Sequence, residues 1–203
     1  LTSGTVEARI KLDELPSSGT TATIISMMDR ATDAKFNLFL TDQQLSCRMS
    51  TSGWTGVGPL SSSIISTSTP LSGQLRKALT TDFVNIAICA DASNMNLVAN
   101  YIDSISGIPT VTSITVSQQH SPDLLPSWYQ GGAPEELVGL FQYNDALVIG
   151  GEIRDLTGAI KEDNVINLYK GLIHEVRLWR TGLSLVDLSS HTLNFESVST
   201  DYT

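Results

Sequence analysis

The chain has 203 residues, of which 41% are apolar and only 16% are charged, and it contains 25 serines and 21 threonines. Its formal net charge of −9 argues against a nucleic-acid partner, which selects for clustered Lys and Arg, and against an anionic membrane surface. Since no apolar run approaches the ~20 residues that span a bilayer, we expect no membrane insertion. A surface rich in hydroxyl groups and poor in charge favours an all-β extracellular module.

The first predicted element is a half-buried strand over residues 5–12, in which apolar and polar residues alternate. Further short β-like runs follow at 22–28, 36–40, 45–49, 83–90, 95–102, 110–116, 137–141, 146–149 and 171–179. Clusters of Gly, Pro, Asn, Asp and Ser separate them, and helical periodicity is almost absent. This pattern indicates a sandwich or a barrel of antiparallel strands. We expect one domain over residues 1–203.

One short peripheral helix is predicted over residues 184–190, because Ser184 can cap it and Asp187 then occupies the third helical position. Two segments, 50–73 and 117–136, are long and irregular, and loops of this length either carry function or are permissive insertions. The alternation also predicts a buried core face. Its members are Val6, Ala8, Ile10, Val84, Ile86, Ile88, Val176 and Leu178.

The stretch from Gly171 to Leu188 resembles the closing strand and following helical turn of concanavalin A-like jelly-roll domains of the laminin-G and pentraxin kind. The matching positions are Gly171, Ile173, Val176, Trp179, Leu183, Ser184 and Leu188. Residues 5–11 resemble the first strand of that family, and residues 83–100 resemble its central hairpin. The resemblance implies an antiparallel jelly-roll β-sandwich. It implies little about function, because the superfamily contains lectins, adhesion modules, glycosidases and lyases.

Within the closing strand, Ile173 falls out of phase with the apolar and polar alternation, which suggests a β-bulge or the true start of the strand.

Cys47 and Cys89 are the only cysteines. If they lie on neighbouring strands, as the resemblance allows, they form a disulfide; the alternative is two buried free thiols. The resemblance also places Glu152 where pentraxins bind calcium. A single structural calcium held by Glu152, Asp155 and Asp163 is therefore one interpretation, and a solvated acidic hairpin is the other. No other cofactor is expected.

The sequence lacks the closely spaced pair of carboxylates that a glycosidase of this fold would need. Glycosidases of this superfamily place two carboxylates on one strand at short intervals, and no such run occurs. The histidines, His120, His174 and His191, are far apart in sequence and are interpreted as ordinary surface or rim residues. Aromatic side chains that can stack on sugars occur in the two irregular segments. They are Trp128, Tyr129 and Trp54.

We therefore interpret the sequence as a non-catalytic recognition module for a glycan or glycoprotein, lectin-like or adhesive, on a cell or particle surface. Because the chain starts at Leu1 rather than Met, we expect it to be part of a larger extracellular protein. Assembly into a homo-oligomer or with neighbouring domains is compatible with this interpretation. Two alternatives stay open: a polysaccharide-cleaving hydrolase or lyase of the same fold, and a structural or assembly domain.

Overall fold

Two five-stranded sheets stack face to face and enclose the core. The computed structural model describes residues 4–28, 35–51, 63–90, 94–103, 110–119, 146–153, 164–179 and 181–194. Sheet 1 has the strand order β12 (Gly171–Trp179), β1 (Gly4–Leu12), β6 (Val84–Ala90), β7 (Asn94–Asp103) and β8 (Thr110–Gln119). Sheet 2 has the order β5 (Ser63–Pro70), β4 (Gln44–Thr51), β3 (Lys35–Thr41), β2 (Thr21–Met28) and β9 (Ala146–Ile149). A small ladder joins β10 (Glu152–Ile153) to β11 (Val165–Ile166).

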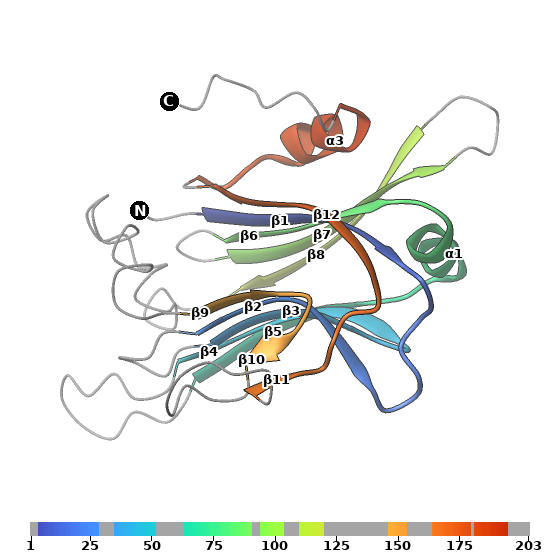
Figure 1. Ribbon diagram of the computed structural model, residues 1–203. Coiled ribbons are helices and arrows are strands. Elements are labelled where there is room, and N and C mark those ends of the chain that lie inside the picture. Colours follow the sequence, from blue (N-terminus) through green and yellow to red (C-terminus); the bar gives the residue numbers. More distant parts are fainter. Residues whose placement is uncertain are drawn as a thin grey trace.

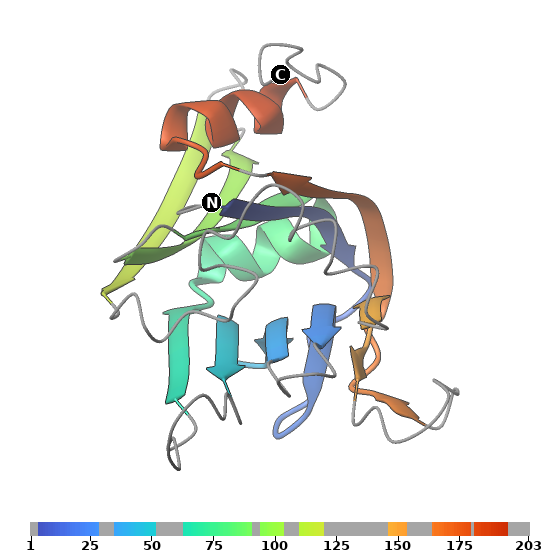
Figure 2. The same ribbon diagram turned by 90° about the vertical axis from the view of Figure 1, so that its left-hand side faces the viewer.

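Every described strand pair is antiparallel, and the two sheets lie above one another in Figures 1 and 2. This confirms the predicted all-β antiparallel sandwich. β5 and β8 lie on one flank of the sandwich, at the left in Figure 2, whereas β9 and β12 lie on the other. Among the described helices, none is long and apolar enough to cross a membrane.

The core lies between the inner faces of the two sheets, as the alternation predicts. Of the predicted core residues, six on β1 and β6 are buried and Val176 is half-buried against the core. For Leu178 the prediction is wrong, because 45% of it is exposed. It shares a face with its register partner Val6. However, β12 is an edge strand, so a side chain near its end has a neighbouring strand on one side only.

The helix α1 (Gly73–Thr81) is a departure from the sequence prediction, which had one helix. Its Leu75, Ala78 and Leu79 follow helical spacing and join the core between the sheets. The Ser72 side chain caps the helix by accepting a hydrogen bond from the Leu75 N–H. The serine- and glycine-rich surroundings concealed this short amphipathic pattern.

The helix α3 (Leu185–Leu193) confirms the predicted C-terminal helix and its cap. Ser184 and Asp187 form a reciprocal capping box, in which each side chain binds the other residue's N–H. α3 lies on the outer face of sheet 1, where it contacts β6, β7 and β8 (Figure 1). Beneath it is a second apolar cluster, with Trp179 packed against its side. The cluster comprises Ala87, Cys89, Val98, Leu183 and Leu188.

A β-bulge in the β1–β12 ladder confirms the irregularity expected at Ile173. Arg9 pairs with Glu175 and Ile10 pairs with Ile173, so His174 is the extra residue. The bulge places Ile173 on the core side and keeps Glu175 on the outer face of the sheet. β12 begins at Gly171, whose φ of +144° favours glycine.

The two cysteines are free thiols and lie in different sheets. Cys47 belongs to the core between the sheets, whereas Cys89 belongs to the cluster under α3. The structure therefore has the second of the two alternatives, buried unbridged thiols, since the neighbouring-strand condition for a disulfide is not met. Burial raises the pKa of both thiols.

Candidate functional site

The aromatic residues predicted to stack on sugars, Trp54, Trp128 and Tyr129, lie outside the described residues. The same holds for His120 and for two of the three predicted calcium ligands, Asp155 and Asp163. Among the predicted ligand or metal residues, only Glu152 belongs to the described part of the chain. The sugar-stacking platform and the calcium site therefore stay predictions.

Glu152 has a structural role on the outer face of sheet 2. Its carboxylate accepts hydrogen bonds from Asn37 Nδ2 at 3.1 Å and from Asn167 Nδ2 at 2.5 Å. Ser26 Oγ in turn donates to Asn37 Oδ1 at 2.7 Å. This network ties β10 to β2 and β3. Within the described segments, no three His, Cys, Asp or Glu side chains come together to hold a metal ion.

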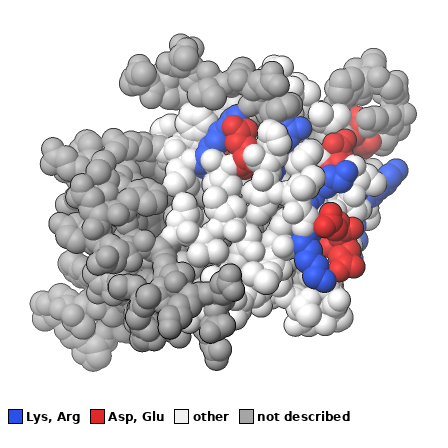
Figure 3. Space-filling view, viewed as in Figure 1, with Lys and Arg blue, Asp and Glu red and all other residues white. Residues whose placement is uncertain are grey.

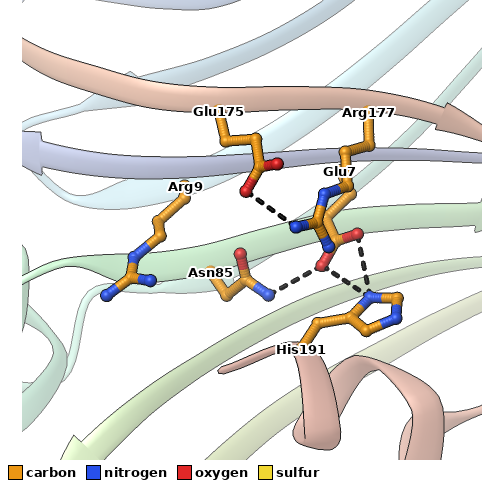
Figure 4. A pocket seen from close by; sticks show the side chains of 6 residues that line it. All are labelled: Glu7, Arg9, Asn85, Glu175, Arg177 and His191. Atoms are coloured by element: carbon orange, nitrogen blue, oxygen red, sulfur yellow. Dashed lines mark hydrogen bonds and ion pairs between the residues drawn. The ribbon is translucent and has the colours of Figure 1, made fainter. Parts of the chain in front are cut away.

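A second polar cluster lies on the outer face of sheet 1, next to α3 (Figure 4). At its centre is Glu7 of β1, which is only 3% exposed. Asn85 Nδ2 donates to its Oε1 at 2.7 Å, and Trp179 Nε1 donates to its Oε2 at 3.2 Å. His191 Nδ1 lies 3.1 Å from the Oε2 atom and 3.2 Å from the Oε1 atom. The buried carboxylate thus has partners from β6, β12 and α3 (Figure 4).

Strand alternation and the position of α3 together build this cluster. Glu7 and Arg9 face outward because the residues that alternate with them, Val6, Ala8 and Ile10, face the core. Asn85 lies directly opposite Arg9 on β6. His191 is in the last turn of α3 and its ring stacks on Trp179, with centroids 5.4 Å apart and planes at 20°. The interpretation of His191 as a surface residue is therefore wrong: it is 3% exposed and holds the helix to the sheet.

A shallow depression adjoins the cluster, and the side chains around it leave essentially no room for a water-sized sphere. Its lining residues are Glu7, Arg9, Asn85, Glu175, Arg177 and His191. Figure 4 shows Arg177 joined to Glu175, whereas the Arg9 guanidinium lies apart from them at the edge of the depression. Charged side chains are sparse on the face of the molecule shown in Figure 3, and some of them gather beside β12.

The charged groups of the depression are held in fixed positions. Arg177 Nη2 forms an ion pair with Glu175 Oε2 at 2.8 Å, and the Arg177 side chain is only 12% exposed. The Arg9 guanidinium lies over the Phe83 ring, 5.1 Å from its centroid. Burial lowers the pKa of Arg9, and the charges of Asp82 and Glu175 oppose this effect. An arginine with a lowered pKa still carries its charge at neutral pH.

The polar row continues beyond the depression to Asn100 on β7, directly opposite Asn85. Asn100 is 1% exposed, and its Oδ1 atom has no hydrogen-bond donor among the described residues. A buried acceptor without a donor is unfavourable by about 1–3 kcal/mol. A hydroxyl group or a water molecule that reached this atom would remove that cost.

Comparisons with known proteins show likeness in structure but not in sequence. No protein-family model matches the chain, and no curated protein matches it. The carbohydrate-binding module CBM40 of the Ruminococcus gnavus IT-sialidase superposes with a TM-score of 0.54 and 16% identity, over 95% of this chain and 83% of that one. The same module bound to α2,3-sialyllactose gives a TM-score of 0.51 at 17% identity, with the same coverage.

Two larger proteins contain a similar fold. The enzymatically active domain of bacteriophage CBA120 tailspike protein 2 superposes with a TM-score of 0.52 and 13% identity, over 95% of this chain and 24% of that one. The receptor-binding domain of botulinum neurotoxin C/D superposes with a TM-score of 0.51 and 12% identity, over 95% of this chain and 36% of that one. At these identities the shared property is the fold. The β-sandwich is thus common to all of them, and a closer relation to laminin-G or pentraxin domains stays a hypothesis.

The residues of the depression were missed by the sequence analysis, although one signal pointed to them. Alternation on the closing strand places Arg177 and Trp179 opposite to Val176, which predicts a second, partly covered face. Glu7 and Arg9 occupy the same outer face on β1. What the sequence lacked was the pairing of β1 with β12, which brings these outward residues together.

Proposed function

We propose that the chain is a non-catalytic recognition module for a glycan or glycoprotein, and that the depression on sheet 1 is its binding site. The observation that carries this proposal is the convergence of Arg9, Arg177 and Glu175 around one shallow depression. Aromatic rings flank these groups, with Phe83 under Arg9 and Trp179 beside Glu7. Fixed polar groups next to aromatic rings are typical of sugar-binding sites.

Sugar hydroxyl groups both donate and accept hydrogen bonds, and the depression offers both kinds of partner. The guanidinium groups of Arg9 and Arg177 donate, and the carboxylate of Glu175 accepts. The unpaired Oδ1 of Asn100 lies one strand further along the same row. Because the side chains leave essentially no volume inside the depression, a sugar would lie across its rim rather than fill it. We therefore expect one or two sugar units to bind, with millimolar to micromolar affinity.

The burial and the hydrogen bonds of the Glu7 carboxylate argue for binding rather than hydrolysis. A glycosidase needs two carboxylates, one to donate a proton and one to attack or to activate water. Glu7 and Glu175 line the same depression, but the oxygens of Glu7 already contact Asn85, Trp179 and His191. A carboxylate that is 3% exposed and hydrogen-bonded in this way is not free to react with a substrate.

The comparisons support this proposal through the fold. One neighbour is a carbohydrate-binding module bound to sialyllactose, and another is a receptor-binding domain. Recognition of this kind suits an extracellular or surface location within a larger protein. Trp54, Trp128 and Tyr129 remain proposed as additional sugar contacts, and a calcium ion at Glu152, Asp155 and Asp163 remains proposed as a structural one.

A glycan array, screened with and without calcium, tests the proposal. For the ligand that it identifies, we expect Arg9→Ala and Arg177→Ala each to weaken binding at least ~10-fold, because each removes a charged donor. Lys11→Ala is the matched control: Lys11 is another cation on the outer face of β1, and it does not line the depression. The proposal fails if no glycan binds, or if the two arginine variants bind as well as the control.

A further inference from the structure

The charged groups of the depression on sheet 1 are balanced against one another. Two arginines and two glutamates are among its described lining residues, so their formal charges cancel while His191 is neutral. The Glu7 oxygens accept hydrogen bonds from Asn85 and Trp179, and the His191 ring lies against both of them. These lining residues therefore offer a ligand charged donors and acceptors without a net positive charge.

The more exposed partner of the ion pair in this depression is the carboxylate. The Arg177 side chain is 12% exposed, whereas the Glu175 side chain is 33% exposed. To bind Arg177 at Nη2, an anionic ligand would have to displace Glu175 Oε2, which lies 2.8 Å from that nitrogen. The ligand would then lie beside a carboxylate that had lost its partner, and like charges placed side by side are strongly unfavourable.

The second arginine of the depression, Arg9, also lies in the field of carboxylates. Its guanidinium is at the edge of the depression (Figure 4), 5.1 Å from the centroid of the Phe83 ring. Burial lowers the pKa of Arg9, and the negative charges of Asp82 and Glu175 act in the opposite direction. These two carboxylates would repel an anion that approached Arg9. At longer range, the net charge of −9 on the chain acts in the same sense.

We propose that this site selects uncharged glycans over acidic ones, and that Glu175 is the residue that determines this selectivity. The inference rests on the proposed function of the depression. The hydroxyl groups of an uncharged sugar can donate to a carboxylate and accept from a guanidinium without breaking the ion pair. Arg177 binds Oε2 of Glu175, and the other oxygen, Oε1, can accept from a sugar hydroxyl.

This selectivity would distinguish the chain from a neighbour with the same fold. The CBM40 module is bound to α2,3-sialyllactose, a glycan that carries a carboxylate. At 17% identity the likeness to that module extends to the fold alone. The charge balance of the depression is therefore a better guide to the class of ligand than the neighbour is.

An array that presents uncharged glycans beside their uronate, sialylated and sulfated counterparts tests the proposal, with lactose and α2,3-sialyllactose as one of the pairs. We expect the wild-type chain to bind the uncharged member of a pair at least ~10-fold more tightly than the acidic member. The affinity for the uncharged member should change less than ~2-fold between about 50 and 500 mM salt, because the ligand forms no ion pair that salt could screen.

The variant Glu175→Gln tests the residue itself. The substitution removes the charge and nearly keeps the size of the side chain, so an acidic ligand no longer competes with a carboxylate for Arg177. We expect the ratio of the uncharged-glycan affinity to the acidic-glycan affinity to fall at least ~10-fold. Glu14→Gln is the matched control and should leave this ratio unchanged. Glu14 is also ion-paired, with Lys170 at 3.0 Å, and it does not line the depression.

The outcomes separate failure of the selectivity from failure of the proposed function. If the wild type binds acidic glycans as tightly as uncharged ones, or more tightly, the selectivity is overturned and the proposed function stands. The same holds if Glu175→Gln leaves the ratio unchanged while it retains the wild-type circular dichroism spectrum. A steep loss of affinity with added salt overturns the selectivity without any variant. If glycans of neither class bind, the proposed function fails and the inference fails with it.

Discussion

Removal of the His191 side chain should destabilise the protein by separating α3 from sheet 1. The imidazole contacts both oxygens of Glu7, at 3.1 and 3.2 Å, and stacks on Trp179. Leaving a buried polar group without one of its hydrogen-bond partners costs about 1–3 kcal/mol, and more when the group is charged. Asn85 and Trp179 still donate to Glu7 in the variant, so we expect about 2–3 kcal/mol for His191→Ala. For a chain of this length that corresponds to a fall in Tm of about 4–12 °C.

Urea unfolding followed by circular dichroism measures this loss, and a double-mutant cycle with Glu7→Gln assigns it to the pair. Both side chains are nearly inaccessible to solvent, so we expect a coupling energy of about 1–3 kcal/mol. Ser189→Ala is a suitable control, since it alters α3 without touching Glu7. A loss below ~0.5 kcal/mol for His191→Ala, or single-variant losses that simply add, would refute the argument that this contact fixes α3.

Three further predictions concern the core, the thiols and the start of β12. Ile86→Ala, in the core, should lower the free energy of unfolding by about 2–5 kcal/mol, measured with urea. Leu178→Ala, at the exposed edge, should lower it by less than ~1 kcal/mol. Equal losses for the two variants would contradict the assigned burial. Cys47 and Cys89 should react with iodoacetamide only after unfolding, because burial raises the pKa of both. Since the native thiols stay protonated while unfolded ones ionise, stability should fall as the pH rises above 9.0, the ordinary pKa of a thiol; rapid native alkylation, or constant stability there, would count against buried thiols. Gly171→Ala should cost at least ~1 kcal/mol in the same unfolding assay, because its φ is +144° and a Cβ would lie 2.2 Å from a main-chain oxygen; an unchanged midpoint would contradict this.

Local patterns located most of the described strands, but they missed β5 (Ser63–Pro70), which lies in the segment 50–73 that was interpreted as long and irregular. Period-two alternation located β1, and the capping residues Ser184 and Asp187 located the start of α3. Both signals act over a few residues and are visible in the sequence. α1 was missed because its apolar face has only Leu75, Ala78 and Leu79, within a segment whose composition is typical of a loop.

The candidate site was not predicted, because it depends on contacts between residues far apart in the chain. Glu7 and His191 are 184 residues apart, and no local pattern couples them. The exposure of Leu178 likewise depends on the position of β12 at a sheet edge, which only the strand order reveals. Alternation gives the face of a strand on which a side chain lies, whereas strand order decides what covers that face.

The most direct test of the proposed binding site is a glycan titration followed by NMR of the side-chain indole N–H groups. The chain has three tryptophans, Trp54, Trp128 and Trp179, so each reports on one region. A site in the depression predicts that the Trp179 signal shifts with ligand concentration, since this N–H binds Glu7 in the wall of the site. It also predicts that Arg177→Ala abolishes that shift. Saturable shifts of the Trp54 or Trp128 signals alone, with Trp179 unchanged, would place the binding site in the loops and contradict the account.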